Sequence, residues 1–194
     1  MADPAYIVDG VLTDGEAWVG IATNTVSGSD TALVTFASTD DGQVGDFSQY
    51  MDLVLISYSR SGNTNTTYKL TFNDDTGTNY ARQYLYGDGS SATAASQTGL
   101  DYFDFQWVPP SSAGANEFGC SVTHLFDINS GKYKSGFSQI AGDQDGNGWV
   151  TLVTSIWESQ AAITELDIRD WGGAAAIGDG STFSLFGVLP RMVA

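Results

Sequence analysis

Hydrophobic and polar residues alternate with a period of two along much of this chain. In Thr67–Phe72 every second residue is apolar or aromatic, and Asp101–Val108 places Phe103, Phe105 and Trp107 on one side. Successive side chains of a β-strand point to opposite faces, so this alternation predicts strands with one face buried. Helical periodicity is nearly absent.

Two further segments have strand-like patterns. In Trp149–Trp157, the apolar residues Val150, Leu152 and Ile156 share one face, as expected for a half-buried strand. The run Leu53–Ile56 is apolar throughout, which predicts a strand covered on both sides.

Short runs of the same kind, separated by turn residues, fill most of the remaining chain. Clusters rich in Gly, Asn and Asp supply the positive φ angles that tight turns need. A single turn of helix is expected at Glu158–Ala162. Further strands are predicted at Ala17–Val26, Thr31–Ala37, Tyr80–Tyr86, Glu117–Phe126, Tyr133–Ile140, Ile163–Ile168 and Thr182–Val188.

This spacing of strands and turns predicts the fold class. About ten short strands are typical of an all-β protein, here a single antiparallel β-sandwich that resembles a jelly roll, with little or no helix. No linker divides the chain. We expect residues 16–188 to form the sandwich, 1–15 to form an extended N-terminal arm, and 189–194 to form a C-terminal tail.

The charge balance limits the partners. The 194 residues include 23 acidic and 7 basic ones, which gives a net charge of −16 at pH 7. A phosphate backbone would be repelled, so nucleic acid is excluded as a partner, and an anionic membrane surface is disfavoured. Residues 1–20 contain no Lys or Arg, and no apolar stretch approaches about 18 residues, so neither a signal peptide nor a membrane-spanning helix is expected. We expect a soluble protein made in a cytoplasm.

The chain contains few residues suited to nucleophilic catalysis or metal binding. Cys120 is the only cysteine, which excludes an intrachain disulfide, and its expected environment is buried and apolar. His124 is the only histidine, and no G-x-S-x-G elbow accompanies it. We therefore expect no catalytic residue and no enzymatic activity.

Carboxylates leave one enzymatic alternative open. Two of them at a fixed separation suffice for the hydrolysis of a glycosidic bond. A solvated surface position is the more frequent fate of acidic residues. The acidic residues in strand-like positions are Asp101, Asp104, Glu117, Glu158, Glu165 and Asp167.

The segment Asp143–Gly148 resembles the first half of a calcium loop. Oxygen-bearing side chains stand at Asp143, Asp145 and Asn147, and a glycine occupies the sixth position. Position 12, where a carboxylate should close the site, is Thr154. A hairpin turn explains the same residues without an ion. Calcium is therefore a candidate cofactor, and otherwise none is expected.

Aromatic residues make up 12% of the chain and suggest a carbohydrate-binding alternative, because exposed rings can stack on sugars. Packing in a core is the more frequent role of such rings, and we expect it for Trp107, Trp149 and Trp157, which lie in predicted strands. The candidates for exposed, glycan-binding rings are Trp171, Tyr84 and Tyr86.

Six segments contain turn and strand-end motifs in a fixed order. They are Leu70–Tyr80, Tyr84–Ser91, Pro110–Gly119, Tyr133–Ser135, Ile156–Thr164 and Phe183–Val188. In this order they resemble a β-sandwich family found in structural proteins of tailed-bacteriophage virions. The resemblance covers roughly residues 50–188 and includes no catalytic signature.

The resemblance implies a virion component. A capsid decoration (cement) protein is favoured, because the sandwich accounts for nearly the whole chain and leaves little for a fibre shaft or a tail-docking domain. Its partners would be the major capsid protein or other virion proteins, and it would form a homo-oligomer such as a trimer, so that many weak contacts add up. The alternative is a tail-tip or fibre adsorption protein that binds host surface glycans. A polysaccharide-degrading enzyme ranks third.

Overall fold

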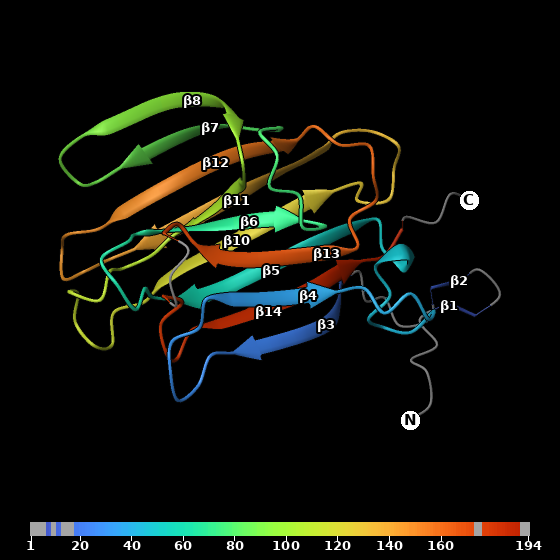
Figure 1. The fold of residues 1–194 in the computed structure, drawn as a ribbon, viewed down its shortest axis with the longest axis horizontal. Coiled ribbons are helices and arrows are strands. Elements are labelled where there is room, and N and C mark those ends of the chain that lie inside the picture. Colours follow the sequence, from blue (N-terminus) through green and yellow to red (C-terminus); the bar gives the residue numbers. More distant parts are fainter. Residues whose placement is uncertain (1–6, 9–10, 13–17, 173–175, 191–194) are drawn as a thin grey trace.

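Two antiparallel β-sheets of eight and four strands pack face to face in the computed structural model, which describes residues 7–8, 11–12, 18–172 and 176–190 (Figure 1). This arrangement confirms the predicted all-β, single-sandwich fold class. Two short strands, β1 (Ile7–Val8) and β2 (Val11–Leu12), form a separate pair within the expected N-terminal arm. The rest of that arm, and residues 191–194 of the expected tail, lie outside the described residues.

The strands of both sheets come from all parts of the described chain. In spatial order the large sheet contains β3 (Trp18–Thr25), β14 (Thr182–Val188), β5 (Asp52–Ser59), β10 (Gly119–Phe126), β11 (Lys134–Gly142), β12 (Trp149–Trp157), β7 (Tyr80–Gly87) and β8 (Ala92–Leu100). The small sheet contains β4 (Leu33–Ala37), β13 (Glu165–Asp170), β6 (Thr67–Phe72) and β9 (Phe103–Trp107).

Eight of these strands have the connectivity of a jelly roll. When β3, β4, β5, β6, β9, β10, β13 and β14 are counted in chain order, the first, eighth, third and sixth adjoin in the large sheet. The second, seventh, fourth and fifth adjoin in the small one. This order is that of two interlocked Greek keys. Two inserted hairpins, β7–β8 and β11–β12, widen the large sheet beyond β10, and in Figure 1 β7 and β8 extend past the small sheet.

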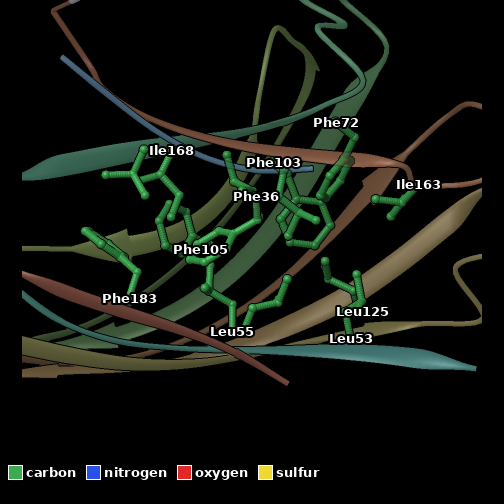
Figure 2. Close-up of a cluster of buried hydrophobic side chains, with 14 of the residues drawn as sticks. Phe36, Leu53, Leu55, Phe72, Phe103, Phe105, Leu125, Ile163, Ile168 and Phe183 are labelled. Carbon is green, nitrogen blue, oxygen red and sulfur yellow. The ribbon is translucent and has the colours of Figure 1, made fainter. Parts of the chain in front are cut away.

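The core lies between the two sheets. Figure 2 shows Leu53 and Leu55 of β5 in one cluster with Phe72, Phe103 and other labelled side chains of the small sheet. These four side chains are fully buried. The ring centroids of Phe72 and Phe103 lie 5.3 Å apart in an edge-to-face arrangement, a geometry that the aromatic quadrupole favours.

Every predicted strand overlaps an observed one, and β8 is the one long strand that the sequence did not predict. Its sequence, ATAASQTGL, consists of small and polar residues, and all of it except Leu100 is exposed. The helical turn expected at Glu158–Ala162 is wrong, because this segment is irregular. A 3₁₀ turn, η1 (Phe47–Gln49), forms elsewhere. No helix among the described residues is long and apolar enough to cross a membrane.

Two expectations about orientation are also corrected. Cys120 is exposed rather than buried, since it points away from the core on β10. In β12 the face with Val150 and Leu152 is the outward, exposed one, whereas Thr151, Val153 and Trp157 point inward and are buried. Alternation identifies the two faces of a strand, but not which of them meets the core.

Candidate functional site

A cleft lined with aromatic side chains lies where the inserted hairpin β7–β8 passes the edge strand β9. Arg82, Tyr84 and Tyr86 alternate along β7 and therefore point to the same side. That side faces β9, where Trp107 lies 6.0 Å from Tyr84 and 5.2 Å from Tyr86 between ring centroids. A second tryptophan, Trp149 of β12, lies 6.4 Å from Trp107. The four rings form one wall behind the cleft.

A buried ion pair fixes Arg82 beside these rings. Its guanidinium donates to the Oδ2 atom of Asp104, a residue of β9 that is fully buried. Burial raises the pKa of Asp104 above its usual range, and the guanidinium opposes that shift. The same guanidinium lies 5.1 Å from the ring centroid of Tyr84 and 5.9 Å from that of Tyr102, within cation–π range.

Trp171 forms the opposite side of the cleft and is 46% exposed. Its ring meets Tyr102 edge to face at 4.9 Å, and the Nζ atom of Lys69 lies 4.8 Å from its centroid. Lys69 in turn is 3.0 Å from a carboxylate oxygen of Asp101. Trp171 is therefore half-exposed and held in place from two sides.

A buried carboxylate anchors the segments on both sides of Trp171. The Oδ2 atom of Asp170 accepts hydrogen bonds from Gly172 N and Asn65 Nδ2, both at 2.8 Å. The backbone N–H of Trp171 donates to the carbonyl of Thr67 at 3.2 Å. These contacts join the loop before β6 to the turn after β13. Residues of both segments line the cleft.

The cleft has a volume of about 290 Å³. Of its lining residues, Arg82 has a buried Nε atom without a hydrogen-bond partner. The lining residues are Thr64, Asn65, Thr66, Thr67, Arg82, Trp107 and Trp171.

Of the three residues proposed as exposed, glycan-binding rings, Trp171 alone is exposed and lines the cleft, and Tyr84 and Tyr86 are partly buried. Tyr84 and Tyr86 pack behind Trp107 in the wall of the cleft. Sequence reasoning missed Arg82 and assigned Trp107 to the core, although Trp107 is only half-buried. The alternation along β7 could have indicated Arg82, since it shares a face with both tyrosines.

The outer face of the large sheet is the second feature of note. Its eight strands contain only three Asp, Glu, Lys or Arg residues, namely Asp52, Lys134 and Arg82. Lys134 is buried and donates to two backbone carbonyls, and Arg82 faces the cleft. Large hydrophobic side chains exposed on this face include Ile56, Tyr58, Leu85, Val122, Phe126, Val150 and Leu152.

A shallow hollow of about 790 Å³ lies on this face over the inserted hairpins. Leu85 of β7 and Leu152 of β12 are directly paired across the sheet, and Phe137 of β11 and Ala94 of β8 lie beside them in its lining. Leu85 is 58% exposed. Contiguous exposed apolar surface of this kind marks an interaction site more often than a solvated one.

His124 lies on the same outer face without a nucleophile. Its Nε2 atom is 2.9 Å from Asp52 Oδ2, and its ring stacks on Phe126 at 4.0 Å. Within the described part of the chain, no serine or cysteine side chain is hydrogen-bonded to it. The Asp52 Oδ1 atom accepts from the backbone of Asp127. Both oxygens of the one carboxylate on this face therefore have a hydrogen-bond partner.

Two of the six strand-like carboxylates meet. Glu165 and Asp167 of β13 gather with Asp74, and one oxygen of each lies within 4.8 Å of the others. Burial raises the pKa of Glu165, and the charges of Asp167 and Asp74 add to that shift. Arg169 occupies the group, donating to Asp167 at 2.7 Å and to Asp74 at 3.4 Å. The positive charge of Arg169 partly offsets the negative charges of these carboxylates. The three acidic residues and Arg169 thus form a salt-bridged cluster on the small sheet.

The remaining strand-like carboxylates are dispersed. Asp101 and Asp104 belong to the ion pairs beside the cleft. Glu117 follows a turn, donating its backbone N–H to Gly114, and Glu158 donates its backbone N–H to Asn79. Neither of these two belongs to a cluster of three acidic residues among the described part of the chain.

The candidate calcium residues form the tip of the β11–β12 hairpin. Asp145 and Gly146 have φ angles of 55° and 83°, as the two central residues of a type I′ turn require. The backbone N–H of Gln144 donates to the carbonyl of Asn147, and the N–H of Asn147 donates to the carbonyl of Gln144. Asp143 Oδ1 accepts from Gly146 N at 2.7 Å. The turn alone explains these residue types, and calcium binding at Asp143, Asp145 and Asn147 stays a prediction.

Comparisons with known proteins identify no relative of this chain. No family model, no curated protein and no solved structure matches the chain. Functional inference therefore rests on the aromatic cleft, the outer face of the large sheet and the sequence motifs.

Proposed function

We propose that this protein is a structural subunit of a tailed-phage virion, a capsid decoration protein that docks on the shell through the outer face of its large sheet. The observation that carries the proposal is the near absence of charge from this face in a chain of net charge −16. Asp52, its one carboxylate, is buried and bonded to His124.

The physical argument concerns where the charge lies. Acidic residues keep copies of the protein apart in solution, since like charges repel. The centre of a protein interface is depleted of charged residues and rich in aromatic and aliphatic ones, because each unpaired charge buried there is costly. The outer face has this composition. The ordered motifs from Leu70 to Val188 support a virion as the place where it is used.

Assembly follows from the same feature. A decoration protein present in many copies needs only modest contact energy from each, because symmetry multiplies the effect. Docking by a neutral face leaves the acidic loops in solvent. We propose the major capsid protein as the partner, and further copies of this chain, in a trimer or similar ring, as lateral neighbours.

Cys120 provides a direct test, since it is the only cysteine and is exposed on the outer face. N-ethylmaleimide should alkylate it readily in the free protein. In protein bound to expanded capsids of the encoding phage, alkylation should slow by more than about tenfold, because docking excludes the reagent. Equal rates in the two states would contradict docking by this face.

A matched control places the thiol on the opposite surface. In a Cys120→Ser background, Ala37→Cys puts a cysteine on an exposed position of β4 in the small sheet. Its alkylation should be as fast on the particle as in solution. Protection of Ala37→Cys instead of Cys120 would assign docking to the small sheet.

Location in the particle tests the decoration role itself. Cryo-electron microscopy of purified virions should show many copies distributed over the capsid, and the bound protein should raise the temperature at which capsids rupture. Density for this protein at the tail tip or in a fibre would overturn decoration in favour of an adsorption role.

A further inference from the structure

The aromatic cleft lies outside the proposed docking surface. It opens on the side of β7 that faces β9, whereas Leu85 and the hollow lie on the other side of the same strand. A particle-bound subunit therefore keeps the cleft free. We propose that this cleft binds a neutral pyranose residue of a polysaccharide.

Stacking surfaces are the first reason. Trp107 and Trp171 both line the cleft, one from β9 and one from the turn after β13. The face of an aromatic ring carries partial negative charge, so it attracts the partly positive C–H groups on the apolar face of a sugar. Exposure of 46% leaves Trp171 free to make this contact.

Polar groups at the rim and in the wall are the second reason. The side chains of Thr64 and Thr66 are exposed at the rim. Among the lining residues, Arg82 also has a buried Nε proton without a partner. Sugar hydroxyls donate and accept at once, and they or bridging waters can satisfy such groups.

Charge balance selects a neutral ligand. The two cations beside the cleft are each paired with a carboxylate, Lys69 with Asp101 and Arg82 with Asp104. Among the described residues that line the cleft or contact its rings, no unpaired cation is left to attract a phosphate, sulfate or uronate group, and the chain as a whole is strongly acidic. An anionic ligand would be repelled.

The size of the cleft suits one residue of a longer chain. Its volume of about 290 Å³ is at the lower limit for small-molecule pockets, about 300 Å³. It is open to solvent, so a sugar bound there can belong to a longer chain. Recognition of a repeating chain by one such subsite is weak, and many copies on one particle would add avidity.

The experiment titrates the purified full-length protein with neutral oligosaccharides of the malto, cello, laminari, manno and chito series. Isothermal titration calorimetry should show saturable binding of at least one series, with quenching or a shift of tryptophan fluorescence. No binding by any series would overturn the proposal. Binding only of an anionic oligosaccharide, such as one from polygalacturonate, would overturn it as well.

Two tryptophans of nearly equal exposure provide a matched pair of variants. Trp171→Ala should weaken binding by at least about tenfold, as expected for loss of a central aromatic contact. Trp18→Ala removes a ring that is 45% exposed on β3, at the far edge of the large sheet, and should leave binding unchanged. Equal affinity of Trp171→Ala and the unmodified protein would place the sugar elsewhere.

Failure of this proposal is distinguishable from failure of the docking proposal. Trp171→Ala should bind capsids like the unmodified protein, because the cleft lies away from the docking face. If capsid binding fails while sugar binding persists, only the decoration role is overturned.

Discussion

Polar side chains are buried between the sheets at several points, and some of them are paired with one another. Gln106 of β9 accepts hydrogen bonds from Ser57 of β5 and Ser121 of β10, and all three side chains are buried. Asp104, two residues earlier, is neutralised by Arg82. Buried polar groups are tolerated when they are paired and costly when a partner is removed.

The Arg82–Asp104 pair gives a prediction at this scale. Arg82→Met should destabilise the protein by about 3–5 kcal/mol, because it leaves the Asp104 carboxylate buried without a counter-charge. The double variant Arg82→Met/Asp104→Leu should recover much of that loss, since no charge remains buried. Urea denaturation followed by fluorescence measures both. A loss below about 1 kcal/mol in the single variant would show that the pair is dispensable.

At the scale of elements, the inserted hairpin β7–β8 depends on its turn. The chain reverses at Gly87–Ser91, where the Oδ1 atom of Asp88 accepts from the backbone of Ser90 at 2.9 Å and of Ser91 at 2.7 Å. The two serine hydroxyls donate to the same carboxylate. β8 has almost no buried side chain, so this turn and the ladder to β7 hold it.

The turn predicts a pH dependence. Hydrogen bonds from the Ser90 and Ser91 backbones, and then from their hydroxyls, hold the pKa of Asp88 well below its usual range. The stability they contribute is therefore complete above the ordinary carboxyl pKa near 3.8 and is lost as pH falls through the lower folded-state pKa.

Hydrogen exchange measured by NMR tests this dependence. Protection of the Ser90 and Ser91 amides, relative to their intrinsic exchange rates, should decrease as pH falls below about 3.8. In Asp88→Ala the same amides should be weakly protected at every pH. Protection that stays constant down to pH 2 in the unmodified protein would contradict the role of this carboxylate.

At the scale of the whole molecule, the two inserted hairpins contribute to both proposed surfaces. Together they add four strands beyond β10, which extends the uncharged outer face and leaves β7 beside the edge of β9. A jelly roll without these hairpins would have neither the hollow around Leu85 and Leu152 nor the Arg82 wall of the cleft. Insertion into a fixed framework thus contributed to the candidate functional surfaces.

A charged substitution on the outer face of the large sheet should impair assembly without impairing folding. Leu85→Lys should leave the melting temperature within about 2 °C, since surface substitutions rarely change stability by more than about 0.5 kcal/mol. Capsid binding should weaken by at least about tenfold, because docking would bury an unpaired ammonium group.

Leu33→Lys is the matched control for that variant. Leu33 is exposed on β4 in the small sheet, and the same change there should leave capsid binding intact. Sedimentation of capsids with each variant measures the difference. Equal binding by both variants would show that the outer face of the large sheet is not the docking surface.

The sequence by itself determined which segments are strands and where the chain turns. Strand β6 alternates cleanly because one face meets the core, and Asp145-Gly146 accepts the positive φ angles of a tight hairpin. Strand β8 was not predicted, because almost none of its side chains is buried. Without a buried face, Ala92–Leu100 has no alternation of apolar and polar residues. Local patterns report burial, and they fail where burial is absent.

Only the tertiary structure decided which faces are outside and which side chains meet. The face of β12 that contains Val150 and Leu152 points to solvent, and alternation cannot distinguish that from the reverse. Arg82 and Trp171 line the same cleft because the insertion sets β7 beside β9 while β13 pairs with β6. Such proximity between residues far apart in the chain depends on strand order, which no local pattern encodes. Trp171 could thus be named from the sequence, whereas the cleft that it lines together with Trp107 and Arg82 could not.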